Sequence, residues 1–391
     1  MCTLSPLAYL VMVKVLLMNN RVDGRLESLD VLRGLDLFLL VCFQPIFIHV
    51  AIAQGEDSWA KRIFDVLFTH VEWEGFHLWD QIMPLFLFMA GVSIPYAMAK
   101  YQSEEGGKKS LIWRVFRRVV LLWIFGAIVQ GNLLDWDIKA LYLYTDTLQA
   151  IAAGYLFSVF LFFLLPVHGL FGMIFLLPLV YTTGMLWTGG YEPGNNLAEQ
   201  IDREVLGRFV YGATVLEDGK VQFSGWYHYG WIYSTLNFTA TMLCGVVVGM
   251  LLKFPLTNVK KIKLLVVWGC ACLLIAYGLT SFEPVIKRIW TSSMMFLTSG
   301  ISILLVLFFY YYIDVCKRGN WLKWLKIYGM NSILAYMLFY TLKTDSLREF
   351  WLHGLEPLLG VYYSVLFEMA HVAIVFLILW ICYRQKIFLK V

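Results

Sequence analysis

The segment 68–84, FTHVEWEGFHLWDQIMP, gathers side chains that can move protons. Within eleven residues it carries two histidines and three carboxylates: His70, Glu72, Glu74, His77 and Asp80. A histidine titrates near neutral pH and can take a proton from an attacking nucleophile, while a neighbouring carboxylate can orient the ring and stabilise its cation. This segment is therefore the best catalytic candidate in the chain.

Two other interpretations of the segment stay open. A polar loop at a membrane surface carries ordinary interfacial histidines, and composition alone favours that interpretation. The pairs His70/Glu74 and His77/Asp80 also have a spacing that suits metal ligands on one helix face. Gly75 lies between the two pairs and interrupts such a helix, so we expect no metal.

Charged side chains also stand at the edges of apolar runs. Asp80 precedes an almost uncharged run, where a carboxylate is costly unless it is paired or lines a watery cavity. Asp30 and Asp36 lie at the start of the first predicted span, and Arg33 lies between them. An ion pair that anchors this helix and a ligand-binding role for Arg33 are equally supported.

A basic cluster follows at positions 114–118. Arg114, Arg117 and Arg118 have the spacing i, i+3, i+4, which puts them on one helix face. Such a face orients a membrane helix, and it equally suits the phosphates of a cofactor that arrives from the cytoplasm.

Uncharged polar groups and aromatic rings add candidate contacts. An amide inside an apolar run needs hydrogen-bond partners, most often on another helix. Aromatic rings near positions 226–231 can stack on a sugar, although an interfacial belt is their commoner role. The amides are Gln44, Gln149, Asn237 and Asn331, and the rings are Trp226, Tyr227, Tyr229 and Trp231.

Membrane-spanning helices must position these residues. Of the 391 residues, 60% are hydrophobic and only 15% are charged, which excludes a soluble globular protein. The apolar runs predict an all-α, polytopic bundle of ten to eleven helices. Ten spans are expected near residues 35–53, 78–99, 115–133, 147–165, 168–188, 234–252, 264–280, 292–313, 327–342 and 362–383.

The remaining composition excludes other classes. The net charge of +4 does not indicate nucleic acid binding, because Lys and Arg lie in short clusters between apolar runs. The seven cysteines lie mostly inside those runs and form no CxxC pair, so neither a disulfide framework nor a zinc site is expected.

Basic residues predict the orientation of the bundle. Of the 31 Lys and Arg residues, 21 lie in the segments on one side of the ten predicted spans, so both termini should be cytoplasmic. The polar segment 189–233 should form a small external cap. Residues 1–20 are expected to be an N-terminal extension or an interfacial helix, and 21–391 a single transmembrane domain.

Four strings in the same order resemble one family. They are SLDVLRGLDLFLLV from position 28, THVEWEG and FHLWDQIMPLFLFMAGVSI from position 69, PVIKRIWTSS from position 284, and YGMNSILAY from position 328. Together they are similar to the heparan-α-glucosaminide N-acetyltransferases, and the match runs from about residue 26 to 340. This resemblance implies a multi-helix enzyme that moves the acetyl group of cytoplasmic acetyl-CoA to an amine on a terminal glucosamine across the membrane.

The resemblance also implies residue roles. His70 matches the family's catalytic histidine, followed by Trp73 and Gly75, while Asp80 and Pro84 match positions in the next helix. The predicted orientation puts His70 on the non-cytoplasmic side, in agreement with a family whose acceptor is not cytoplasmic.

The chain departs from the family at two places. Gln44 stands where the family has an active-site asparagine, and YHYGWIYSTL replaces an acidic motif before the sixth span. The large N-terminal domain of the animal enzyme has no counterpart in this sequence, so we expect a bacterial inner-membrane form. The resemblance also suggests a homodimer.

These observations give an expected mechanism. Acetyl-CoA would bind with its phosphates near Arg33 and the Arg114/Arg117/Arg118 face, and His70 would act as general base, oriented by Asp80 or Glu74. Gln44 or Asn331 would donate to the developing oxyanion, and the acceptor would contact Trp73, Gln149, Trp226 and Tyr229. An acetyl-histidine intermediate is the competing scheme.

Other functions remain open from the sequence. A transporter or flippase of a small solute or glycan precursor would use the same polar groups inside the membrane. An O-acetyltransferase of a glycan would use the same histidine with a hydroxyl as acceptor, and an inactive relative would keep only the scaffold.

Overall fold

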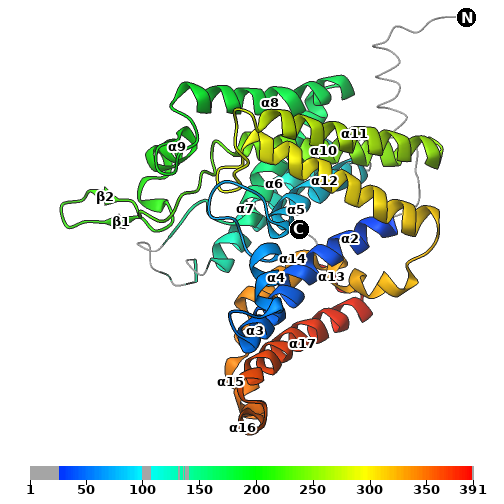
Figure 1. Cartoon of the computed structure of the whole chain (residues 1–391). Helices are drawn as coiled ribbons and strands as arrows, with labels where there is room; N and C mark the ends of the chain where they lie inside the picture. The colour runs from blue at the N-terminus through cyan, green and yellow to red at the C-terminus, as the bar shows by residue number, and fades with distance from the viewer. Residues whose placement is uncertain (1–25, 99–106, 131–132, 135, 137–140, 390–391) are drawn as a thin grey trace, which may run out of the picture.

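The computed structural model describes residues 26–98, 107–130, 133–134, 136 and 141–389. Long helices run side by side across Figure 1, and a small lobe with α9 and the hairpin β1–β2 projects from one end of the bundle. The predicted segment 1–20 lies outside the described residues.

The first half of the bundle begins with one long helix that contains a π-helical turn. A π-helical turn, Leu39–Phe43, joins α2 to α3 without a break, so that the three elements form one span of 28 residues. A short 3₁₀ turn, Leu78–Gln81, leads directly into α5. The helices are α2 (Glu27–Phe38), α3 (Gln44–Gln54), α4 (Trp59–Leu67), α5 (Ile82–Met98), α6 (Gly107–Val129), α7 (Thr147–Leu164) and α8 (Val167–Trp187).

The second half contains the cap and the remaining helices. The cap holds α9 (Leu197–Leu206) and two antiparallel strands, β1 (Thr214–Val215) and β2 (Val221–Gln222). The helices that follow are α10 (Thr235–Lys253), α11 (Asn258–Leu279), α12 (Ser292–Phe309), α13 (Lys326–Met330), α14 (Ser332–Thr341), α15 (Asp345–Leu352), α16 (Glu356–Leu359) and α17 (Tyr363–Arg384). The predicted all-helical membrane fold is thus confirmed.

Eight helical segments of the described chain are long and apolar enough to cross a membrane. The other two predicted spans correspond to α6, which carries several basic residues, and to the pair α13–α14, which is interrupted at Asn331. The basic residues of α6 and the interruption of α13–α14 explain why these two segments are not among the eight long apolar ones.

Contacts between distant loops show that α6 also crosses the bundle. The loop before α5 and the loop between α11 and α12 meet, because His70 Nδ1 lies 2.9 Å from Lys287 Nζ. Two loops at the same end must be separated by an even number of crossings. Between these loops, five crossings are made by α5, α7, α8, α10 and α11. The sixth must be α6, whose 23 residues correspond to about 34 Å at about 1.5 Å per residue.

Glycines let the central helices approach closely. A Cβ atom at Gly245 of α10 would lie 2.1 Å from the backbone oxygen of Phe88 in α5. Gly34 of α2 and Gly329 of α13 have the same function, because a Cβ at either position would lie 2.0 Å from a backbone oxygen of the other segment. These close contacts fix the helices that line the central cavity.

Candidate functional site

Three side chains from two loops meet at the end of the bundle that carries the cap, here called the cap end. His70 Nδ1 lies 2.7 Å from Asp80 Oδ1, and Lys287 Nζ lies 3.3 Å from the same oxygen. Asp80 is almost fully buried, whereas 48% of the His70 side chain is exposed. If the ring donates from Nδ1 to the carboxylate, Nε2 is left as the basic nitrogen.

Local backbone contacts bring these residues together. The second oxygen of Asp80 accepts a hydrogen bond from the backbone N–H of His77 at 2.9 Å, so the carboxylate caps the short turn that opens the helix. Gly75, with φ of +128°, donates from its backbone N–H to the Val285 oxygen. This contact joins the His70 loop to the Lys287 loop.

The surroundings favour the neutral imidazole. Removal from bulk water lowers the pKa of His70, its hydrogen bond to Asp80 opposes this, and the cations of Lys287 and Arg288 lower it further. Burial lowers the pKa of Lys287 to about 8, although the Asp80 carboxylate acts in the opposite direction. A neutral imidazole beside an ionised carboxylate is the state in which a general base works.

A cavity of about 460 Å³ begins at this cluster and continues through the bundle. Residues of α2, α5, α6, α7, α13 and α14 line it, and on α5 they are Ile82, Met83, Phe86, Ala90 and Ser93. Trp79 and Ser93 both line the cavity, and the helix between them corresponds to about 20 Å at about 1.5 Å per residue. The cavity therefore runs along the bundle axis.

Arginines lie at the opposite end, here called the arginine end. Arg33, Arg114 and Arg118 line the cavity, and Arg33 donates to the Ser93 hydroxyl at 2.9 Å. Arg118 also lies over the Tyr155 ring, 4.2 Å from its centroid. Arg117 is exposed and is not a lining residue, so the structure separates it from the two arginines with which it was grouped.

Two of the predicted amides have other partners. The Asn331 side chain donates to the Ile387 oxygen at 2.9 Å and accepts from the Leu389 N–H at 3.0 Å, so it fastens the segment after α17 to the start of α14. Gln149 accepts from the backbone N–H groups of residues 145 and 146 and thereby closes the capping box of α7. Neither amide lines the cavity.

Two further candidates also stand apart from the cavity. Gln44, which is half-buried at the start of α3, is not one of its lining residues. Glu74 is exposed and pairs through its backbone with Ile286, so Asp80 is the carboxylate that contacts the histidine. Among the described residues no group of three or more potential ligands could hold a metal ion.

The aromatic candidates lie in the cap or against it and are not among the residues that line the cavity. Trp73 donates from Nε1 to the Tyr191 oxygen at 3.1 Å. Tyr229 stacks between neighbouring rings, with the Arg288 guanidinium 5.3 Å from its centroid, whereas Trp226 is 63% exposed.

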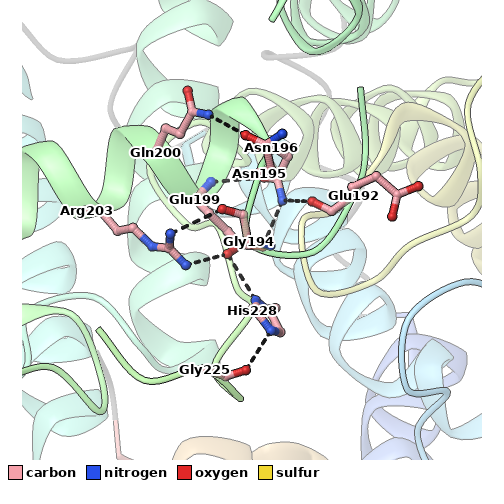
Figure 2. Close-up of polar contacts among 9 residues, drawn as sticks. All are labelled: Glu192, Gly194, Asn195, Asn196, Glu199, Gln200, Arg203, Gly225 and His228. Atoms are coloured by element: carbon pink, nitrogen blue, oxygen red, sulfur yellow. Dashed lines mark hydrogen bonds and ion pairs between the residues drawn. The ribbon is translucent and has the colours of Figure 1, made fainter. Parts of the chain in front are cut away.

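A buried carboxylate holds the cap together. Figure 2 shows Glu199 at the centre of a network in which Asn196, Arg203 and His228 converge on its two oxygens. Trp73 lies edge-on to His228 at a ring separation of 6.1 Å. The network therefore fixes the cap against the loop that carries His70.

Sequence reasoning missed two polar residues of the site. Lys287 lies within the string PVIKRIWTSS, and its place in an outer loop was the available signal. Tyr336 lines the cavity from α14 and donates to the buried Asp146. No sequence spacing connects Tyr336 with Asp146, because the two residues are 190 positions apart.

Fold and site together define a polytopic helical membrane protein with a histidine–aspartate–lysine cluster and an arginine cluster joined by one cavity. No family model matches the chain. It is nonetheless distantly related to the heparan-α-glucosaminide N-acetyltransferases. It is 26% identical to the enzyme from Homo sapiens over 370 residues, covering 80% of this chain and 52% of the relative, and 26% identical to that from Mus musculus over 371 residues, covering 80% and 53%. The chain thus spans about half the length of these relatives.

Proposed function

We propose that the protein is a membrane acetyltransferase that moves an acetyl group from acetyl-CoA to an amine at the opposite face of the membrane. The observation that carries this proposal is the single cavity that joins His70 to Arg33, Arg114 and Arg118. The distant relation to enzymes named N-acetyltransferases supports the same reaction type.

The arginine end suits the cofactor. Guanidinium groups form strong, charge-assisted hydrogen bonds with phosphate, and Arg33, Arg114 and Arg118 would hold the phosphates of acetyl-CoA there. The pantetheine arm would extend along the apolar middle of the cavity, which Leu37, Phe86 and Leu122 line. The thioester would then lie near the cap end.

The cap end suits the transfer. The amine nitrogen attacks the thioester carbonyl carbon, so that a C–N bond forms and the C–S bond breaks. His70 Nε2 takes the proton from the nitrogen and returns it to the departing sulfur, while Asp80 stabilises the imidazolium. Burial lowers the pKa of the resting imidazole, and the cation of Lys287, beside both groups, lowers it further.

The orientation is part of the proposal. The excess of Lys and Arg on one side of the predicted spans supports a cytoplasmic arginine end and a cap end that faces away from the cytoplasm. In a bacterial inner membrane, the acceptor would be an amino sugar or glycan on the periplasmic side.

Labelled acetyl-CoA tests the activity. Membranes with the protein should transfer label to glucosamine, and the His70→Ala variant should lose the transfer at an unchanged protein level. The His353→Ala variant is the matched control, because His353 is an exposed residue outside the cavity. Solute uptake that is indifferent to acetyl-CoA, without transfer of label, would instead indicate a transporter.

A further inference from the structure

A buried carboxylate behind the cavity wall is not used in the transfer described above. Asp146 is 2% exposed, precedes α7, and accepts the hydroxyl hydrogen of Tyr336 at 3.0 Å. Its other oxygen accepts the backbone N–H of Leu148 at 2.7 Å. Burial raises the pKa of Asp146 to about 6, so it is ionised at pH 7.

Helix register places this pair toward the cap end. A Cβ atom at Gly126 of α6 would lie 3.0 Å from an Asp146 oxygen. Gly126 lies eight residues after Arg118 on the same helix, which corresponds to about 12 Å along the helix axis at about 1.5 Å per residue. Thr147 and Leu148, the next two residues after Asp146, line the cavity. Tyr336 therefore stands far from the arginines.

The hydrogen bond fixes what Tyr336 can offer a ligand. A tyrosine hydroxyl has one hydrogen, and here that hydrogen is given to Asp146. Toward the cavity the oxygen can only accept: the Thr147 side chain hydrogen-bonds to it, and its second lone pair remains for a ligand. The negative charge behind the oxygen strengthens it as an acceptor. The Tyr336 oxygen thus selects a ligand group that donates.

A count of hydrogens separates the two kinds of acceptor. A hydroxyl nucleophile has one hydrogen, which the base His70 requires, and none then remains for Tyr336. An amine has at least two, which suffices for one hydrogen bond to His70 and one to Tyr336. The ionised Asp146 also favours a protonated amine as it enters.

From this geometry we infer that Tyr336, positioned by Asp146, is the residue that makes the site specific for amine rather than hydroxyl acceptors. This inference rests on the proposed acetyl transfer for its reaction, but the binding preference can be measured without turnover. Tyr336 contacts the acceptor, and Asp146 is a positioning residue that acts through it.

Substitution of Asp146 by asparagine should reverse the direction of the hydrogen bond between residue 146 and Tyr336. In Asp146→Asn the amide oxygen still accepts from Leu148, and asparagine caps helices as well as aspartate. The NH₂ group then faces Tyr336 and donates to it, which turns the phenolic hydrogen into the cavity. Tyr336→Phe removes the acceptor altogether. Tyr340→Phe is the matched control, because Tyr340 lines the same wall and has no hydrogen bond to Asp146 among the described contacts.

Calorimetry of the purified protein without acetyl-CoA, with glucosamine and glucose as probes, tests the inference. The wild type should bind glucosamine about tenfold or more tightly than glucose, and Asp146→Asn and Tyr336→Phe should each lose this preference while Tyr340→Phe retains it. Equal binding of both sugars by the wild type, or a preference that survives in both variants, overturns the inference. If Asp146→Asn fails to fold, Tyr336→Phe decides alone. Selective, Tyr336-dependent binding without acetyl transfer would refute the proposed function and leave the amine specificity standing.

Discussion

Replacement of Asp80 by asparagine should slow acetyl transfer without loss of the fold. His70 donates to Asp80 over 2.7 Å, and the imidazolium that forms during transfer loses this charged partner in Asp80→Asn. A hydrogen bond to a charged group contributes about 1.5–3 kcal/mol and a tenfold rate change corresponds to about 1.36 kcal/mol, so the rate should fall about 10- to 150-fold. Because 48% of the His70 side chain is exposed, water screening favours the lower part of this range.

The substitution has a second effect through Lys287. Asp80 is the carboxylate that faces Lys287 Nζ at 3.3 Å, and without it the ammonium opposes protonation of the histidine more strongly. The double variant Asp80→Asn/Lys287→Met should therefore recover part of the lost rate. Such coupling between contacting residues is what a double-mutant cycle measures.

The assay is the initial rate of acetyl transfer from saturating acetyl-CoA to glucosamine, with melting temperature as the check on folding. Glu72→Gln is the matched control, because Glu72 is an exposed carboxylate two residues from His70. The reasoning is refuted if Asp80→Asn stays within twofold of the wild type, or if Glu72→Gln slows the reaction as much.

Three further predictions follow from the site and its packing. Since the Lys287 cation lowers the pKa of His70 and the base must be neutral, Lys287→Met should move the acid limb of the pH–rate profile to higher pH; an unmoved limb contradicts this. Arg118→Ala should raise KM for acetyl-CoA about tenfold or more, whereas Arg117→Ala, outside the cavity, should leave it unchanged; equal effects would remove the proposed phosphate site. Gly245→Ala should lower stability by about 1–3 kcal/mol, seen as a lower melting temperature, because its Cβ would meet the α5 backbone, and Gly278→Ala, which faces open space, should not.

Much of the helical fold could be predicted because apolar runs of spanning length are visible in the sequence. Two predicted spans, α6 and α13–α14, are not among the eight long apolar segments, because the first is rich in basic residues and the second is interrupted at Asn331. Only the contact between the His70 and Lys287 loops shows that α6 crosses the bundle.

The contacts of the histidine cluster could be predicted only where its residues are close in the chain. His70 and Asp80 lie ten positions apart, and the structure brings them into contact. Lys287 lies 217 positions from His70, and Tyr336 190 from Asp146, so packing alone brings these pairs together. The sequence predicts that the amides of Gln149 and Asn331 need partners, and their partners are backbone groups of a helix cap and of the segment after α17.

Acetyl transfer between the two faces of a sealed membrane can be measured in proteoliposomes. Proteoliposomes would hold glucosamine inside, receive labelled acetyl-CoA outside, and contain protein molecules oriented with the arginine end outward. The account predicts labelled N-acetylglucosamine inside the vesicles for the wild type and none for His70→Ala. Product that forms only when both substrates share one face would contradict it.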